Sequence, residues 1–337
     1  MKAVQIRTTG STDVLEYLDL PVPQPGPGQI RIKVESASVN FADVQRRRGE
    51  LYPFPTPMPF IPGSEVAGTV DAQGEDVTNP AIGTSVFALA GRGGDGGYAQ
   101  YALADASGVI PIPPGMNFDM ATSLIVAGST ATLLLTEVTQ LQPGESVLVP
   151  AATGGVGTYA IQIAKLLGAV PIIAAAGSSE KQAAARRLGA TDTVDYAQSG
   201  WTDDVREITG GRGINVVLEM TGGHVFEQSL NCLAPFGRLA VYGRASGTSL
   251  QFGAHTIDHV FYAPSPNQSI INFNLGLWFG RRPETAVEAL RKLIGWVLAG
   301  DIQVQVGQVF PLSHAGEAHR LLEERRAIGK IVLKPWA

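Results

Sequence analysis

The sequence predicts an α/β protein with two domains, one built on a doubly wound parallel sheet and one rich in β-strands. Three observations support this fold class. The chain has 337 residues, 45% of them hydrophobic, so it can bury two cores at roughly 150 residues each. Its middle part alternates short apolar strands with single helices. Its first part combines many prolines with alternating strand patterns.

The first part of the chain is expected to be irregular and β-rich. Nine of the 22 prolines fall within the first 62 residues. Each proline removes a hydrogen-bond donor and fixes φ, so regular helices and central strands are disfavoured there. Alternating polar and apolar residues between the prolines predict a strand with one buried face at 29–34, and further strands are expected at 1–6, 65–71, 85–89 and 98–103.

The middle of the chain has the pattern of a parallel sheet covered by helices. One long helix is expected over 119–141, and a Gln-Pro-Gly turn follows it. Strands that are apolar on both faces then alternate with single helices, which is typical of a buried parallel sheet with right-handed crossovers. The strands are expected at 146–151, 170–176, 193–195, 214–220 and 238–243, and the helices at 157–167, 180–188, 203–209 and 225–233.

The pattern loosens again beyond Gly253. An amphipathic helix is expected over 284–298 and a terminal strand over 329–334. The simplest assembly places the end of the chain with the first domain. We therefore expect one domain from residues 1–120 and 266–337, and the parallel-sheet domain from residues 121–265.

Charge and cysteine content exclude several classes of protein. Only 16% of the residues are charged and the formal net charge is −5, which disfavours both a disordered chain and a nucleic-acid-binding protein. Cys232 is the single cysteine, so no intramolecular disulfide can form. The chain starts with a strand pattern rather than a signal peptide, and the uncharged stretch 120–136 favours a buried helix over a membrane span. We expect a cytoplasmic protein without membrane association.

A glycine loop in the middle part predicts a dinucleotide site. Residues 151–157, Ala-Ala-Thr-Gly-Gly-Val-Gly, follow an expected strand and open an expected helix. They meet the G-x-G-x-x-G spacing with alanine at the first position. Gly154 would let backbone approach a pyrophosphate, Gly157 would let the helix pack close to the strand, and the helix start offers free N–H groups. The alternative is a tight strand–helix turn without a ligand.

The residues after the second strand bear on which nucleotide binds. Dinucleotide folds specific for NAD place an acidic residue at this strand end, whereas here Gly177-Ser178-Ser179-Glu180-Lys181 follows. Ser178 could donate to a 2′-phosphate and Lys181 could supply the charge, so we expect NADPH. Two features leave NADH open. Ser178 or Ser179 could instead cap a helix, with Ser179 and Gln182 as a capping box, and Glu180 is acidic.

Several ordered motifs resemble one family along essentially the whole chain. Residues 63–68, Gly-Ser-Glu-Val-Ala-Gly, followed by Gly74 and Val77, are similar to the G-H-E-x-x-G pattern of the medium-chain dehydrogenase/reductase superfamily. The glycine loop, the segment 215–223 with Glu219 and the closing segment 325–333 also match that superfamily. Together they resemble its zinc-independent quinone oxidoreductase branch. Zinc-containing relatives carry a histidine ligand where this chain has Ser64.

The resemblance implies a GroES-like catalytic domain formed by both chain ends, a Rossmann domain, and a homodimer. It places Asn40 and Tyr52 at the catalytic site. The proline-flanked segment 52–62 and the segment Trp278-Phe279 are expected to shape the acceptor pocket. Gln45 stands where relatives often carry a tyrosine, and the register of Arg325 against Arg326 stays open. The residues expected to bind the cofactor are Thr130, Thr153, Gly154, Gly155, Val156, Gly157, Ser178, Lys181, Tyr196, Thr221, Gly243, Phe273 and Arg325.

No metal site is expected. The first 120 residues contain no Cys and no His, whereas a catalytic zinc of this superfamily needs thiolate and imidazole ligands. His255 and His259 are four residues apart, with Asp258 beside them, but the glutamate of the protease helix motif is missing. No G-x-S-x-G elbow occurs either, which disfavours a serine hydrolase.

Without a Lewis acid, substrates that accept hydride readily are favoured, namely quinones or alkenes conjugated to a carbonyl. We expect direct hydride transfer from NADPH, with Tyr52 and Asn40 orienting the cofactor or substrate. The alternative roles are a packed aromatic for Tyr52 and a turn-stabilising side chain for Asn40; Asp43 is expected to cap a helix. Two other functions stay open: a reductase of enones or enoyl thioesters, and a catalytically silent NADPH-binding redox sensor.

Overall fold

The computed structural model describes residues 1–91, 93–247, 260, 262 and 267–337. The chain forms two compact units. Unit 1 consists of Met1–Val126 and Val304–Ala337, and unit 2 consists of Ala127–Gln303.

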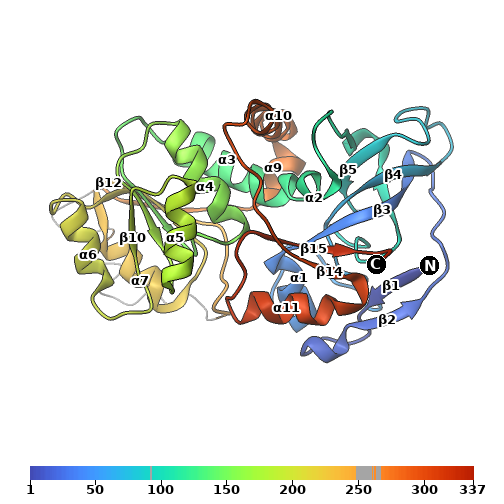
Figure 1. The fold of residues 1–337 in the computed structure, drawn as a ribbon, viewed down its shortest axis with the longest axis horizontal. Coiled ribbons are helices and arrows are strands. Elements are labelled where there is room, and N and C mark those ends of the chain that lie inside the picture. The colour runs from blue at the N-terminus through green and yellow to red at the C-terminus, as the bar shows by residue number, and fades with distance from the viewer. Residues whose placement is uncertain (92, 248–259, 261, 263–266) are drawn as a thin grey trace. The chain divides into compact units, whose positions relative to one another are not determined.

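Between residues 147 and 241, unit 2 alternates strands and helices in the order expected from the sequence (Figure 1), whereas its strand at 269–272 and its helix at 275–281 were not expected. Its strands are β8 (Val147–Pro150), β9 (Ile172–Ala175), β10 (Asp192–Val194), β11 (Ile214–Glu219), β12 (Leu233–Val241) and β13 (Ser269–Asn272). Its helices are α3 (Ser129–Leu133), α4 (Gly155–Leu166), α5 (Ser179–Leu188), α6 (Trp201–Ile208), α7 (Gly223–Asn231), α9 (Leu275–Arg281) and α10 (Pro283–Ala299).

In the part of unit 2 that the structure describes, six strands form one parallel sheet in the order β10-β9-β8-β11-β12-β13. This is the doubly wound Rossmann order, in which the winding reverses between β8 and β11. Helices α4 and α5 pack on each other and against β8–β10, while α6 and α7 pack on each other and against β10–β12 (Figure 1). Every residue of β8 and β9 is buried. The predicted fold class is therefore confirmed for this unit.

The long helix predicted over 119–141 is wrong. The structure has α2 (Phe118–Ala121), a π-helical turn at Leu124–Gly128, α3, and a second π-helical turn at Leu134–Val138. Hydroxyl groups bond back to the preceding turn near these breaks: Thr132 donates to the carbonyl of Gly128, and Thr136 donates to the carbonyl of Thr132. These hydroxyls compete with backbone N–H groups for the helix carbonyls, and an apolar sequence pattern does not show that competition.

Unit 1 is β-rich and contains both chain ends (Figure 1). Its strands are β1 (Lys2–Gln5), β2 (Glu16–Asp19), β3 (Gln29–Val39), β4 (Glu65–Gln73), β5 (Ser85–Leu89), β6 (Tyr101–Asp105), β7 (Ile110–Pro111), β14 (Val306–Pro311) and β15 (Lys330–Lys334). Its α-helices are α1 (Phe41–Arg48), α2 and α11 (Ala315–Glu323). No helix range was predicted for α1 or α11, although Asp43 was expected to cap a helix.

A mixed sheet organises unit 1. Its strand order is β14-β15-β3-β4-β5-β7, with β6 also paired to β3. The C-terminal strand β15 lies antiparallel to β3, with Leu333 opposite Ala37, and parallel to β14. A core of valine, isoleucine and alanine side chains from these strands packs against α11. The chain end therefore completes the N-terminal domain, as expected.

The second boundary between the units lies later in the chain than the sequence suggested. We placed it at 265/266, and the structure places it after Gln303. The reason is sheet pairing: β13 adds a sixth parallel strand beside β12, and α10 packs against α3 and α9. Among the described residues, no helix is long and apolar enough to cross a membrane.

Candidate functional site

The glycine loop of unit 2 connects β8 to α4 without any side-chain cap. Ala151 takes the left-handed conformation at φ 52°, and the loop closes with a 2.9 Å bond from the Gly154 N–H to the Ala151 carbonyl. Gly154 is the N-cap of α4, and no side-chain hydrogen bond caps this helix start. The first N–H groups of a helix lack partners within it, so this turn presents free donors and the positive end of the helix dipole.

Gly157 is required by packing, as predicted. A Cβ atom at this position would lie 2.5 Å from the carbonyl oxygen of Ala152 and 2.8 Å from that of Ala151. A Cβ at Gly154 would meet the Ala151 carbonyl at 3.2 Å, which is a tight but milder contact. The absence of both side chains leaves the backbone amides open to an anion such as a pyrophosphate. This loop therefore fits a dinucleotide phosphate group.

Apart from Thr130, the other expected cofactor-binding residues of unit 2 follow the strands at one edge of the sheet. Parallel strands end at the same edge, where α/β folds bind ligands. Each of the six strands is followed there by at least one predicted residue. They are Thr153, Gly155 and Val156 beside the loop glycines after β8, Ser178 and Lys181 after β9, Tyr196 after β10, Thr221 after β11, Gly243 after β12 and Phe273 after β13.

Ser178 has a capping role. It is the N-cap of α5, and its Oγ accepts a 3.4 Å bond from the backbone N–H of Lys181. The capping box that we considered between Ser179 and Gln182 does not form, because the N-cap of α5 is Ser178. The Gln182 side chain instead donates to the carbonyl of Ala176. Lys181 lies in the first turn of α5, so Ser178 and the Lys181 side chain flank one helix start.

Glu219 shapes the edge of the sheet next to the glycine loop. It ends β11, the strand beside β8, and is completely buried. One carboxylate oxygen accepts the backbone N–H groups of Thr221 and Gly222, the latter at 2.9 Å. Burial raises the pKa of Glu219. The Thr221 hydroxyl is buried and has no hydrogen-bond partner in the described part of the chain. Sequence reasoning quoted Glu219 only as part of a motif.

Two expected residues lie elsewhere. Thr130 is buried in α3. Arg325 belongs to unit 1, just after α11, and takes the left-handed conformation at φ 55°. The neighbouring Arg326 is ion-paired to Glu324 at 2.6 Å.

Phe273, at the sheet edge, stacks on Trp278 with ring centroids 6.3 Å apart.

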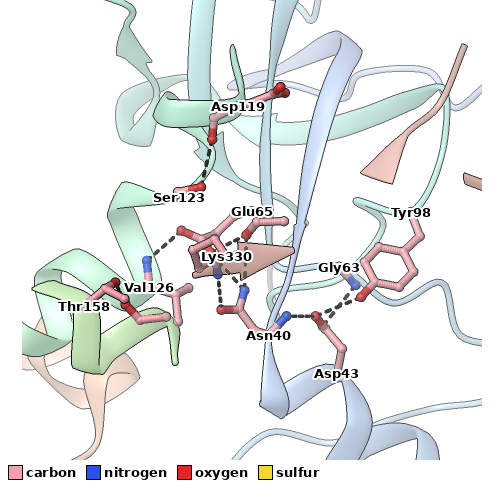
Figure 2. A network of polar contacts seen from close by, with 12 residues as sticks. Asn40, Asp43, Gly63, Glu65, Tyr98, Asp119, Ser123, Val126, Thr158 and Lys330 are labelled. Carbon is pink, nitrogen blue, oxygen red and sulfur yellow. Dashed lines mark hydrogen bonds and ion pairs between the residues drawn. The ribbon is translucent and has the colours of Figure 1, made fainter. Parts of the chain in front are cut away.

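Asn40 belongs to a buried polar cluster in unit 1 (Figure 2). It follows β3 and is the N-cap of α1. Its Oδ1 accepts a 2.6 Å bond from Lys330 Nζ, and its Nδ2 donates at 2.8 Å to Glu65 Oε2. Lys330 and Glu65 also form a buried ion pair at 3.4 Å. The Asn40 amide is thus held at both ends, and β3, β4 and β15 meet at this point.

Glu65 also fixes the π-helical turn. Its second oxygen, Oε1, accepts the backbone N–H of Val126 at 2.7 Å (Figure 2). Sequence reasoning missed the role of Lys330. A signal was present, because alternation along the last strand puts Lys330 and Lys334 on the same face as Val332, which is fully buried.

Asp43 is structural, as expected. Its carboxylate accepts the backbone N–H of Asn40 at 2.8 Å and that of Gly63 at 3.2 Å. The Tyr98 hydroxyl lies 3.2 Å from Asp43 and 3.1 Å from His319 Nε2. Burial raises the pKa of Asp43 to about 6. Burial, with Arg47 nearby, lowers the pKa of His319 to about 3.

Tyr52 lies in the proline-rich segment after α1 and is partly buried. The Arg46 guanidinium stands over its ring, 5.1 Å from the centroid. Burial raises the pKa of Tyr52, so the hydroxyl is protonated and able to donate at neutral pH. Gln45, at the position where relatives often carry tyrosine, lies on α1 with its amide 3.5 Å from Glu50.

No metal cluster is found in the part of the chain that the structure describes: no group of three or more His, Cys, Asp or Glu side chains could hold an ion. His255, Asp258 and His259 lie outside the described residues. His314 and His319 lie in the C-terminal segment of unit 1. The Nε2 atom of His319 is hydrogen-bonded to the Tyr98 hydroxyl.

The fold and the loop define a class of protein. A parallel sheet in the doubly wound order, with an uncapped glycine turn at its reversal point, is a dinucleotide-binding architecture. The other expected site residues, Asn40, Tyr52 and Arg325, belong to unit 1.

Comparison with known proteins agrees with this class. Residues 26–114 match the family model described as alcohol dehydrogenase GroES-like domain, and residues 155–291 match the model described as zinc-binding dehydrogenase. The quinone oxidoreductase of Pseudomonas aeruginosa is 35% identical, and the 2-haloacrylate reductase of a Burkholderia species is 33% identical, each with 99% of both chains covered. A solved structure of Escherichia coli quinone oxidoreductase complexed with NADPH aligns with a TM-score of 0.91. It is 28% identical, and the alignment covers 99% of this chain and 100% of that one.

The chain belongs to the zinc-independent quinone oxidoreductase branch of the medium-chain dehydrogenase/reductase superfamily. The expected GroES-like and Rossmann domains are thereby confirmed.

Proposed function

We propose that this protein is an NADPH-dependent oxidoreductase that reduces quinones or related conjugated carbonyl compounds without a metal ion. The observation that carries the proposal is the sheet edge of unit 2, where the ends of all six parallel strands bear expected cofactor-binding residues around an uncapped glycine turn. The relatives named quinone oxidoreductase and 2-haloacrylate reductase support the acceptor class.

The residues of unit 2 fit a phosphorylated dinucleotide. The amides at the start of α4 would hold the pyrophosphate, because Gly154 and Gly157 leave them uncovered. Ser178 and Lys181 would hold the 2′-phosphate, because both lie at the start of α5 and the strand end before them carries no carboxylate. Thr130, Tyr196, Thr221, Gly243, Phe273 and Arg325 stay predicted contacts.

NADPH, when bound, supplies the hydride. The task of the protein is then to orient the acceptor and stabilise negative charge on its oxygen. We assign the orienting hydrogen bond to the Tyr52 hydroxyl, which burial keeps protonated. Asn40 has its amide engaged with Lys330 and Glu65, so we assign it to holding the start of α1.

A turnover screen tests the proposal. NADPH oxidation is followed with 9,10-phenanthrenequinone, benzoquinones, simple enones and a crotonyl thioester. We expect turnover with quinones or enones that persists in the presence of a metal chelator. Tyr52→Phe is expected to lower the turnover rate with the best acceptor about tenfold. An unchanged rate in Tyr52→Phe removes Tyr52 from the mechanism.

The same screen separates the alternative functions. Turnover confined to the thioester and enones identifies a C=C reductase. Tight NADPH binding with no turnover across the panel identifies a catalytically silent cofactor-binding protein and contradicts the proposed reduction.

Cofactor choice is tested by titration with NADPH and NADH. We expect tighter binding of NADPH, and we expect Lys181→Ala to remove most of the difference by weakening NADPH about tenfold. Lys165→Ala, on the exposed last turn of α4, is the matched control and is expected to change neither affinity. Equal affinities in the parent protein contradict the cofactor assignment.

We further propose that the protein is a cytoplasmic homodimer, in line with its family resemblance. Strand β13 is the end strand of the parallel sheet among the described residues, and end strands of this kind offer unpaired backbone groups to a second copy. Light scattering on the purified protein tests the dimer; a mass of one chain contradicts it.

A further inference from the structure

Arg46 is an unusual residue for its position in unit 1. It lies on α1 and is the first residue of the run Arg46-Arg47-Arg48. In the structure only 2% of Arg46 is exposed. Its guanidinium stands over two aromatic rings, 4.1 Å from the centroid of Phe60 and 5.1 Å from that of Tyr52. A buried cation of this kind needs compensating contacts, because desolvation of a charge is costly.

Those contacts come from two loops. The Arg46 Nε donates to the Thr56 hydroxyl at 3.0 Å, and Nη2 donates to the Pro55 carbonyl at 3.2 Å. The Nη1 group donates to the carbonyls of Gly93 and Gly94 at 3.0 and 2.9 Å. All four bonds end on uncharged oxygens, so the guanidinium connects the segment 52–60 to the glycine-rich segment after β5.

The composition of segment 52–60 explains why such a residue is needed. Four of its nine residues are proline, Pro53, Pro55, Pro57 and Pro59, and none of these has an N–H to donate. Backbone pairing holds the segment at its end, where Phe60 exchanges hydrogen bonds with Ile6, but the prolines cannot extend that pairing as a ladder. A guanidinium offers five donors in a fixed plane and stacks on aromatic rings, and a lysine ammonium offers neither the fork nor the plane.

We propose that Arg46 is a positioning residue for the acceptor: it fixes the Tyr52 ring and the wall of segment 52–60, and so determines which acceptors bind. This rests on the proposed function, in which the Tyr52 hydroxyl orients the acceptor. Arg46 acts through Tyr52 and the loop rather than by contact with the reacting atoms. Its removal is therefore expected to change acceptor binding while cofactor binding is retained.

The test compares Arg46→Lys with Thr56→Val in the full-length protein. Arg46→Lys keeps the charge and loses the fork, whereas Thr56→Val removes one of the four hydrogen bonds and leaves the guanidinium over both rings. We expect Arg46→Lys to raise the KM of the best quinone about tenfold and to leave the KM of NADPH within about twofold. Thr56→Val is expected to keep both KM values within about twofold.

A double-mutant cycle with Tyr52→Leu separates positioning from general stability. If Arg46 acts through Tyr52, Arg46→Lys has little further effect on the quinone KM once Tyr52 is leucine. Additive effects overturn the proposal, as does an equal rise in the KM of NADPH. If Arg46→Lys does not fold, the quinone KM of Tyr52→Leu is the remaining test. An unchanged quinone KM in that variant also overturns the proposal.

Acceptor binding is measured separately from turnover, by quinone quenching of tryptophan fluorescence in the protein saturated with NADP⁺. The same cycle is run on the dissociation constants. A parent protein that binds quinone but does not turn it over contradicts the proposed function and still allows the Arg46 cycle to be read. A parent protein that binds no quinone overturns both.

Discussion

The carboxyl edge of the parallel sheet in unit 2 and the buried polar cluster of unit 1 are built from the chain in opposite ways. At the sheet edge, backbone amides and absent side chains make the site, and the loop at 151–157 is continuous in sequence. In the cluster, Asn40, Glu65 and Lys330 come from segments up to 290 residues apart and hold one another by side-chain bonds (Figure 2).

This difference has an energetic consequence. A backbone-built loop tolerates changes around it as long as no atom fills its glycine positions. A buried side-chain network depends on every member, because removing one leaves its partners unpaired in a low-dielectric interior. We therefore expect the largest effects of substitution in unit 1, and the sharpest steric effects at the sheet edge.

The largest expected effect is that of Lys330→Met. Both Lys330 and Glu65 are buried, at 3% and 0% side-chain exposure, so removing the cation leaves an uncompensated carboxylate. We expect a loss of about 3–5 kcal/mol in the free energy of unfolding, measured by urea denaturation.

Lys334→Met is the matched control on the same strand. Lys334 pairs with Asp119 at 32% side-chain exposure, so its loss is expected to cost about 1 kcal/mol or less. The double variant Lys330→Met/Glu65→Leu is expected to recover part of the stability lost in Lys330→Met. Equal losses of unfolding free energy in the two lysine variants would show that the buried ion pair contributes no more to stability than the more exposed one.

Gly157→Ala tests the backbone-built side of the comparison. The new Cβ would lie 2.5 Å from the Ala152 carbonyl oxygen, so the start of α4 and the loop at 151–152 must move apart. We expect a loss of about 1–3 kcal/mol in unfolding free energy and at least tenfold weaker NADPH binding, measured by denaturation and by titration.

Gly295→Ala is the control for Gly157→Ala. Gly295 lies within α10, and a Cβ there would meet nothing within 4 Å. Because alanine is the better helix former, this change is expected to raise stability by up to about 1 kcal/mol and to leave NADPH affinity unchanged. Similar NADPH affinities in the two glycine variants contradict the assigned loop.

The smallest expected effect is a pH dependence within unit 1. His319 has a lowered pKa, about 3, so the unfolded chain binds more protons below pH 6.5 and His319 costs stability as pH falls. Asp43 has a raised pKa, about 6, so the folded chain binds more protons and Asp43 adds stability as pH falls through 6. The two contributions oppose each other between pH 6.5 and pH 5.

His319→Phe isolates the two contributions. It keeps a ring beside Tyr98, where the His319 ring now packs edge-on at 5.7 Å, and removes the titration. Relative to the parent, the variant is expected to gain about 1–2 kcal/mol in unfolding free energy between pH 6.5 and pH 5. Asp43→Asn is expected to change in the opposite direction, and parallel pH profiles for all three proteins contradict both assignments.

Sequence reasoning succeeded where the chemistry is local. The strand–loop–helix at 147–166, the glycine requirement at 157 and the end of β15 all follow from contiguous patterns. It failed where distant segments compete for backbone groups. The predicted helix over 119–141 is broken by π-helical turns, one of which gives its Val126 N–H to Glu65, 61 residues away. Nothing in an uncharged stretch indicates such a partner.

What the sequence by itself determined is the alternation of strands and helices, the loop that can accept a diphosphate, and the family, because each depends on residues adjacent in the chain. Only the tertiary structure decided that β13 and α10 join unit 2, that two of the three consecutive arginines are buried, and that the Asn40 amide is held by Lys330. The physical reason is that the burial and pairing of polar groups depend on which strands, distant in sequence, lie side by side. The spacing of residues along the chain does not indicate which strands these are.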